Sequence, residues 1–246
     1  MKKLVAYITS AYPDKNFTID LILALKESGV DSVELGIPFS DPVADGPVIE
    51  EANLKALQNG FKLKDTYDIS KEVAKEIDTL WMGYFNPFYK RGIERVVKEA
   101  KDLNVSGFII PDLPFEEALS YKDIFQKNSL SLIDFVAPTD SKERIKTIVK
   151  NSSKFIYLVA YAGITGANKS EDLKEIIENI KKFTDTPVYV GFGVNEKTAK
   201  EKAKNADGVI VGSAFIKILL REDLTNREKF DNICSLSKII KEKINE

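Results

Sequence analysis

The sequence of 246 residues contains no histidine, one cysteine and one tryptophan. The lack of histidine excludes Ser-His-Asp and Cys-His catalytic arrangements, and nearly all metal sites that use histidine ligands. Acid–base chemistry must therefore fall to Asp, Glu, Tyr or Lys side chains, whose pKa values depend on their surroundings. The one cysteine, Cys234, lies in a segment of helical period, FDNICSLSKIIKEK, and we expect it to be a reduced core thiol rather than a nucleophile.

Long apolar runs, linker-like stretches and an excess of one charge are also missing. The 36 basic and 38 acidic residues form no basic stripe, which argues against nucleic acid as a partner. The apolar run at the N-terminus is too short for a signal peptide or a membrane span, so we expect a cytoplasmic protein that does not enter a membrane. Because no segment is rich enough in Ser, Gly or Pro to be a linker, we expect one domain over residues 1–246.

Short apolar segments alternate with longer, charged segments of helical period along the whole chain. Strands that are nearly all apolar are typical of a parallel sheet with helices as crossovers. Eight such units in a chain of this length predict a closed (β/α)8 TIM barrel, and a doubly wound open sheet is the alternative. The eight expected strands begin at Leu4, Ser32, Thr79, Gly107, Leu130, Phe155, Pro187 and Gly208.

The longest gap between neighbouring strands follows the second strand. Ser32 and Thr79 are 47 residues apart, and the excess begins with the stretch ELGIPFSDPVADGP. In a (β/α)8 barrel the connections that follow strands lie on the catalytic face. We therefore expect a long connection, rich in acids and proline, on that face.

Glu34 is a carboxylate inside an apolar strand. Strand alternation turns it to the opposite face from Val33 and Leu35. If that face is the barrel interior, burial should raise its pKa. A buried ion pair with a lysine is the alternative interpretation. Asp41 and Asp45 follow on the loop, where Asp is also an ordinary turn residue. Three prolines restrict the same loop: Pro38, Pro42 and Pro47.

Glycines gather after the last two expected strands. GFG at 191–193 precedes a helix that we expect to open at Asn195, and GS at 212–213 precedes the segment AFIKIL. Loops after strands seven and eight of a barrel, with glycines and helix N-termini, commonly bind phosphate. A third loop, YAGITGANKS, could close over the same group. These features predict an enzyme for a small phosphorylated substrate that uses carboxylates and no metal; an isomerase, an epimerase and an aldolase-like lyase all stay open.

ELGIPFSDPVADGP resembles the signature segment of the tryptophan synthase α subunit family. Further segments agree in order and place: NPFY, IIPDLPFEE, APTD, GITG, GFGV and VGSAFIK. The resemblance covers essentially the whole chain and implies the (β/α)8 fold. It also implies retro-aldol cleavage of indole-3-glycerol phosphate to indole and glyceraldehyde 3-phosphate, the last stage of L-tryptophan biosynthesis.

The resemblance implies a role for individual residues. Glu34 matches the catalytic glutamate, the acid–base group at indole C3 and at the glycerol hydroxyl. Asp45 matches the catalytic aspartate that accepts a hydrogen bond from the indole N–H, and Tyr157 matches a supporting active-site tyrosine. Tyr7 and Phe192 match walls of the indole pocket. The phosphate would be bound by Gly166, Gly193, Gly212 and Ser213, while Thr165 would order Asp45 when the loop closes.

The resemblance further implies a partner, a PLP-dependent β subunit that receives indole in an α2β2 heterotetramer. The α chain itself would carry no cofactor. Two segments depart from the family pattern: SAYPD at 10–14, and Tyr161 where Arg is common. A subunit that only activates the β chain is the non-enzymatic alternative. The residues that match the β-facing surface are Pro38, Asp41, Pro42 and Asn86.

Overall fold

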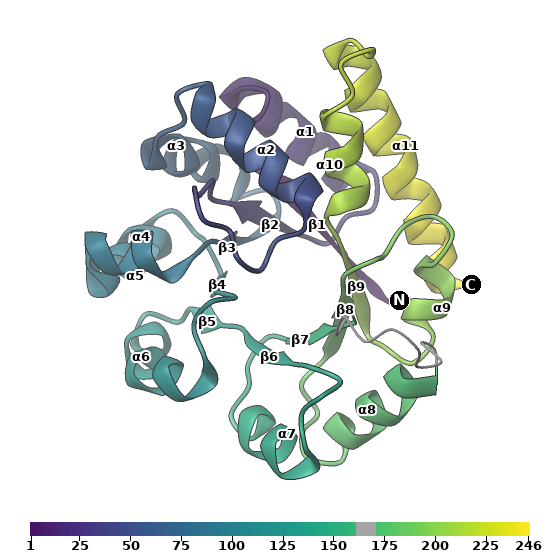
Figure 1. Cartoon of the computed structure of the whole chain (residues 1–246). Coiled ribbons are helices and arrows are strands. Elements are labelled where there is room, and N and C mark those ends of the chain that lie inside the picture. Colours follow the sequence, from purple (N-terminus) through teal and green to yellow (C-terminus); the bar gives the residue numbers. More distant parts are fainter. Residues whose placement is uncertain (161–170) are drawn as a thin grey trace.

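The computed structural model describes residues 1–160 and 171–246, and these form a parallel barrel of strands inside a ring of helices (Figure 1). Every strand pairing in the described residues is parallel. The strands are β1 (Lys3–Thr9), β2 (Ser32–Gly36), β3 (Asp78–Met82), β4 (Gly107–Ile109), β5 (Ser131–Leu132), β6 (Asp134–Val136), β7 (Ile156–Val159), β8 (Val188–Gly191) and β9 (Gly208–Val211).

The sheet closes on itself through a single segment of chain. Its order runs β5-β4-β3-β2-β1-β9-β8-β7-β6, so its two ends are β5 and β6, which only Ile133 separates. The Ile133 amide still donates to the Phe108 carbonyl (2.9 Å), which continues the pairing with β4. The expected fifth strand is thus split, because its first half pairs with β4 and its second half with β7. The barrel prediction is confirmed, and the open-sheet alternative is wrong.

Eleven helices occur in the described residues and surround the strands in Figure 1. They are α1 (Lys15–Glu27), α2 (Pro47–Gln58), α3 (Leu63–Val73), α4 (Phe85–Arg91), α5 (Ile93–Asp102), α6 (Phe115–Lys127), α7 (Lys142–Val149), α8 (Glu171–Lys181), α9 (Ala199–Ala203), α10 (Ser213–Leu219) and α11 (Asn226–Asn245). No helix of the described ranges is both long and apolar enough to cross a membrane.

The helix boundaries follow local capping chemistry, with one correction. Asp14 accepts a hydrogen bond from the Phe17 amide at the start of α1, and Ser141 accepts one from the Arg144 amide at the start of α7. The helix expected to open at Asn195 instead begins at Ala199. Asn195 forms a turn, because its side-chain oxygen accepts from the Lys197 amide (2.9 Å).

The excess length after β2 is mostly helical rather than loop. Residues 37–46 form the connection, and α2 then precedes the crossover helix α3. Pro47 begins α2, where proline lacks only an N–H that would have no intrahelical partner. α2 packs against β1 and α10, and therefore stands beside the carboxyl end of the barrel.

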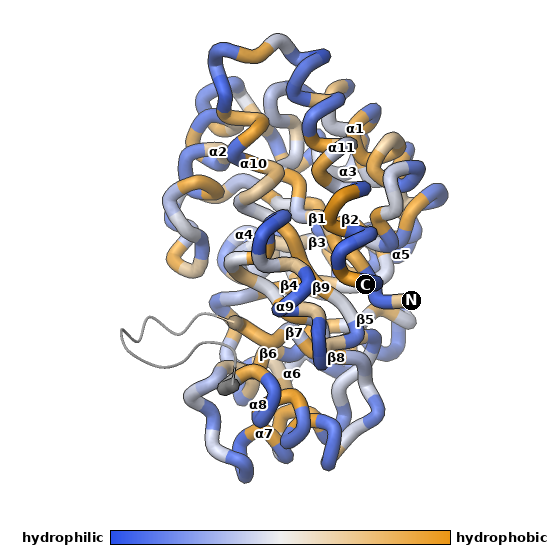
Figure 2. The backbone as a smooth tube through the Cα atoms, turned by 90° about the vertical axis from the view of Figure 1, so that its right-hand side faces the viewer, coloured by the Kyte–Doolittle hydropathy of each residue, from blue (hydrophilic) through white to orange (hydrophobic). Residues whose placement is uncertain are grey.

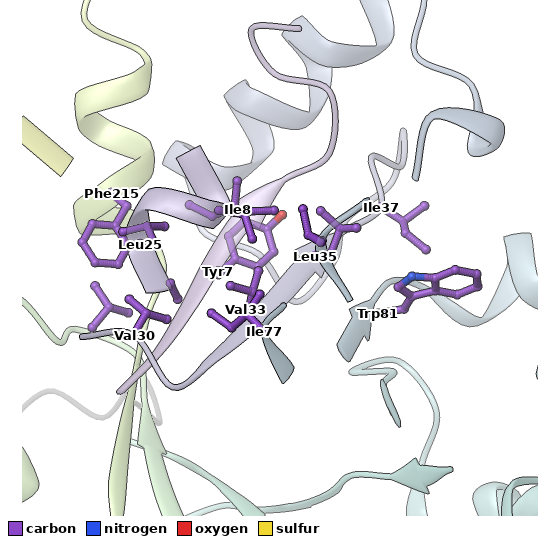
Figure 3. Packing of buried hydrophobic residues seen from close by; sticks show 14 of the residues in the cluster. Tyr7, Ile8, Leu25, Val30, Val33, Leu35, Ile37, Ile77, Trp81 and Phe215 are labelled. Atoms are coloured by element: carbon purple, nitrogen blue, oxygen red, sulfur yellow. The ribbon is translucent and has the colours of Figure 1, made fainter. Parts of the chain in front are cut away.

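The core has two layers because side chains alternate along each strand. Leu4, Ala6 and Ile8 of β1 are fully buried and belong to the large cluster between the strands and the helices. Figure 3 shows this packing, with Trp81 and Phe215 toward its two ends. Val5 belongs to the smaller interior cluster with Leu80, Ile109, Ile133, Phe155, Tyr157 and Ile210. In Figure 2 the strands are mostly hydrophobic, and hydrophilic stretches recur along the surrounding helices.

Cys234 is half-buried on α11 and forms no disulfide, and burial raises its pKa. Both observations agree with a reduced thiol that packs as a small apolar side chain.

Candidate active site

A cavity of about 310 Å³ opens at the carboxyl ends of the strands. Its lining comes from nearly every part of the barrel, which confirms that the loops after the strands form one face around it. The lining residues are Tyr7, Glu34, Ala44, Asp45, Gly46, Pro47, Val48, Ile49, Met82, Ile109, Pro111, Phe135, Tyr157, Phe192, Gly193, Val194, Ile210, Gly212, Ser213 and Lys217.

Glu34 is a buried, unpaired carboxyl group in this cavity. It is 2% exposed, and its Oε1 atom has no hydrogen-bond partner in the described part of the chain. Burial, followed by repulsion from Asp45, raises its pKa from 4.5 to about 8. No lysine or arginine of the described ranges forms an ion pair with it, which removes the support for the ion-pair interpretation. At neutral pH, Glu34 is therefore mainly a protonated acid.

Asp45 lies on the connection after β2 and is held by two neighbouring elements. The Asn53 side-chain amide, on α2, donates to Oδ2 of Asp45 (3.2 Å). Tyr84, just before α4, donates its hydroxyl proton to Asp45 and accepts a hydrogen bond from the Ala44 amide (3.1 Å). Burial raises the pKa of Asp45 to about 6, against the lowering effect of these two donors. At neutral pH, Asp45 is therefore mainly ionised.

The different surroundings of the two carboxyl groups therefore give them different protonation states at neutral pH. With pKa values of about 8 and about 6, Glu34 holds a proton where Asp45 holds a negative charge. Titratable groups whose pKa values are pushed apart in one cavity are a mark of paired acid and base roles. The arrangement can deliver a proton to one end of a ligand and stabilise positive charge at another.

Two tyrosines stand inside the barrel beside glycines of the neighbouring strands. Tyr7 pairs in register with Glu34, and a Cβ atom on Gly36 would overlap the Tyr7 phenol. Tyr157 is placed in the same way against Gly191. Burial raises the pKa of both tyrosines well above the ordinary value, so both keep their protons.

Aromatic rings line the cavity wall near Tyr157. The Phe135 ring stacks on Tyr157 at 5.0 Å between centroids, and Phe192 meets Tyr157 edge-on at 6.3 Å. With Met82, Ile109 and Ile210 they give the flat apolar surface that a planar aromatic ligand requires.

The glycine-rich loops meet at one end of the cavity. Gly193, Gly212 and Ser213 all line it, and Phe192 and Gly193 both have left-handed backbone angles (φ 70° and 68°). Thr198 fixes this turn because its hydroxyl donates to the Gly193 carbonyl (2.7 Å). The backbone amides of these loops can therefore approach an anion, and phosphate binding by them stays a prediction; α9 does not begin where it was expected.

Three predicted features lie outside the described residues: Thr165 and Gly166, expected to bind or order the site, and Tyr161, which departs from the family pattern. The predicted docking residues differ in exposure. Asp41 and Asn86 are exposed and Pro42 is half-buried, whereas Pro38 is buried and presents no surface to a partner. The exposed side chains Val43 and Tyr89 add apolar surface to the same loop and to α4.

The sequence did not predict the contacts of Asn53 and Tyr84 with Asp45, or that Lys217 lines the cavity. Asn53 had one visible signal, since it is a polar residue on the otherwise apolar buried face of α2. Tyr84 closely precedes the segment NPFY, but nothing in the sequence links it to a loop forty residues earlier. The described residues contain no cluster of three side chains suited to hold a metal ion.

Comparison with known proteins agrees with this geometry. The family model described as "Tryptophan synthase alpha chain" matches residues 1–245. The tryptophan synthase alpha chain of Wolinella succinogenes is 61% identical over 246 residues, which cover 100% of this chain and 96% of that protein.

Solved structures are similar over nearly their whole length. The tryptophan synthase subunit alpha from Campylobacter jejuni is 33% identical with a TM-score of 0.87, covering 97% of this chain and 95% of that one. A chain of the tryptophan synthase a2b2 complex from Pyrococcus furiosus is 34% identical with a TM-score of 0.86, covering 98% and 99%.

Proposed function

This chain belongs to the tryptophan synthase alpha chain family, and on this premise we propose that Glu34 and Asp45 are the groups with which it cleaves indole-3-glycerol phosphate. The products are indole and glyceraldehyde 3-phosphate, in tryptophan biosynthesis. The observation that carries the residue assignment is the pair of carboxyl groups in one cavity, with pKa values of about 8 and about 6.

Glu34 acts first as an acid and then as a base. Its proton is added to indole C3, which makes the ring an electron acceptor. The bond between C3 and the glycerol side chain then breaks, and its electron pair restores the aromatic ring. The side-chain hydroxyl becomes the aldehyde and returns its proton to Glu34, so the acid is regenerated.

Asp45 stabilises the positive charge that appears on the indole nitrogen when C3 is protonated. Its carboxylate accepts a hydrogen bond from the indole N–H, and this interaction strengthens as the charge develops. Asn53 and Tyr84 donate to the same carboxylate and hold it in place. Tyr157 supports the site as a neutral phenol beside Glu34.

We assign other residues that line the cavity to the indole end or to the phosphate end of the substrate. Tyr7 and Phe192 pack against the indole ring, while Gly193, Gly212 and Ser213 bind the phosphate through backbone N–H groups. Thr165 and Gly166 belong to the same proposal, as the loop residues that order Asp45 and bind phosphate.

The partner is the tryptophan synthase β subunit, and the similarity to a chain of an a2b2 complex supports an α2β2 heterotetramer. Asp41, Pro42 and Asn86 are available on the face beside the cavity, and Pro38 shapes the loop from inside. PLP belongs to the β subunit, and this chain works without a cofactor of its own. We place the protein in the cytoplasm, as one domain over residues 1–246.

The test is indole release from indole-3-glycerol phosphate by the purified full chain, with and without a β subunit. Release is expected to be slow alone and faster with the partner, and to fall by at least a hundredfold in Glu34→Gln and in Asp45→Asn. Wild-type rates in both variants would overturn the residue assignment. Turnover of sugar phosphates without indole release would favour an isomerase, and β-subunit stimulation without any cleavage would favour a purely activating subunit.

A further inference from the structure

With its proposed substrate bound, the cavity holds more negative charge than positive charge. Both carboxyl groups line it, Asp45 is ionised at neutral pH while Glu34 keeps its proton, and the substrate adds a phosphate with a charge of about −1.5 to −2. Among the described residues that line the cavity, Lys217 is the only basic one. Like charges in a partly enclosed site repel strongly, so a nearby cation decides how well a phosphorylated ligand is held.

Lys217 lies on the helix that forms the phosphate end of the cavity. It is four residues after Ser213 on α10, so the two residues share one helix face. Helical side chains tilt toward the N-terminus of their helix, and this direction brings the lysine stem back toward Ser213 and Gly212. Figure 1 shows α10 directly after β9 and beside β1, at the rim of the barrel.

The Lys217 ammonium group is available, since it forms no ion pair or hydrogen bond with the described residues and its side chain is exposed. Other lysines near this face are engaged. Lys55 binds Glu51 and Glu222 at 3.1 and 3.0 Å, and Lys202 donates to the Phe192 carbonyl at 2.9 Å.

We propose that Lys217 is the cation that recognises the substrate phosphate and makes the site selective for a phosphorylated side chain. The inference rests on the proposed function and deepens it. Backbone N–H groups of the glycine loops orient the phosphate oxygens, and Lys217 supplies the full positive charge that those groups lack. The phosphate keeps its charge throughout the reaction, so Lys217 contributes equally to substrate and transition state.

The experiment uses the full chain with its β subunit and compares Lys217→Met with the wild type. The methionine keeps the length and the apolar stem but removes the charge. Because uniform binding is lost, KM for indole-3-glycerol phosphate should rise about tenfold while kcat changes little. KM should also depend less on salt in the variant, since one screened charge pair is missing.

Two further variants and a second substrate sharpen the result. Lys217→Arg keeps the charge and should restore most of the affinity. Lys204→Met removes a lysine from the opposite end of the barrel and should leave KM at the wild-type value. In the reverse reaction, the loss of kcat/KM should be about tenfold with indole and glyceraldehyde 3-phosphate, and much smaller with indole and glyceraldehyde.

The outcomes separate this inference from the proposed function. If cleavage depends on Glu34 but Lys217→Met has the wild-type KM and salt dependence, the phosphate role of Lys217 is overturned alone. An equal loss with both aldehydes would also overturn it, because the lysine would then act on something other than phosphate. If no indole is formed by the wild type, the proposed function itself fails.

Discussion

Glu34 shows how one buried carboxyl group takes the place of histidine in this chain. Its pKa of about 8 lies close to neutral pH because the strand holds it in the barrel interior, where no lysine or arginine of the described residues pairs with it. The sequence predicted this position correctly, since strand alternation is a local property. Tyr84 could not be predicted in the same way, because tertiary packing alone brings it to Asp45.

The pH dependence of kcat/KM should be bell-shaped. Asp45 must be ionised and Glu34 must be protonated, so activity should rise with an apparent pKa near 6 and fall with one near 8. Steady-state rates of indole release from pH 5 to pH 9.5 measure both limbs. A rate that stays constant across this range would contradict the two assigned roles.

Tyr84→Phe should move the acidic limb of that profile to higher pH. The hydrogen bond that the Tyr84 hydroxyl donates lowers the pKa of Asp45, whereas burial raises it. Removing the hydroxyl should therefore raise the pKa of Asp45. The ring still stacks on Phe39, which limits structural change. The pH profile is the readout, and Tyr89→Phe, at an exposed position on α4, is the matched control. An unchanged acidic limb would show that Tyr84 does not act on Asp45.

Strands and helices were predicted correctly where a local sequence pattern determines them. Their boundaries were predicted less accurately where closure of the barrel or a tertiary contact determines them. All eight strand regions formed, because apolar segments bounded by turns need no distant information. The split of the fifth strand at Ile133 follows from closure, which the sequence does not display. The segment expected to begin a helix at Asn195 forms a turn first, because Thr198 binds the Gly193 carbonyl.

A buried ion pair joins α6 to β6. Lys122 Nζ lies 2.9 Å from Asp134 Oδ1, and Ser152 donates to Asp134 Oδ2 at 2.8 Å. Lys122→Met leaves this carboxylate buried without its cation, and should lower the free energy of unfolding by about 3 kcal/mol.

Urea unfolding measures the effect of this substitution. Arg227→Ala removes an exposed pair on α11 and should cost less than about 1 kcal/mol. The double variant Lys122→Met, Asp134→Leu should recover most of the stability. Equal losses in the double and single variants would show that packing, not the unpaired charge, is responsible.

At the scale of the whole molecule, Glu34 makes stability fall as the pH rises. Below pH 4.5 the carboxyl group is protonated in both the folded and the unfolded chain. Between 4.5 and about 8 only the folded chain keeps the proton, so each pH unit lowers the free energy of unfolding by about 1.4 kcal/mol. Above about 8 the loss is constant.

Glu34→Gln should therefore be more stable than the wild type, by a margin that grows from pH 4.5 to about 8 and reaches a few kcal/mol. Urea unfolding across this pH range gives the difference. Glu117→Gln, at an exposed position on α6, should show no such trend. A margin that does not change with pH would mean that the buried carboxyl group is not neutral in the folded protein.

The two ends of the sheet, β5 and β6, meet at Ile133, and this junction is the seam of the barrel. Its strand pairing bears on where the barrel opens locally to solvent. β4 and β5 are joined by two paired positions, as are β8 and β9, against five between β1 and β2, and no paired positions join β5 to β6 in the described residues. Regions of a protein with few contacts open locally at a lower free-energy cost. The amide protons on either side of this seam should therefore exchange with solvent sooner than those of β1 and β2. Near this seam, β4 carries Ile109 and β6 carries Phe135 into the cavity wall. The part of the cavity wall formed by Ile109 and Phe135 therefore lies beside a weakly paired edge of the barrel, where a ligand that fills the cavity should slow amide exchange.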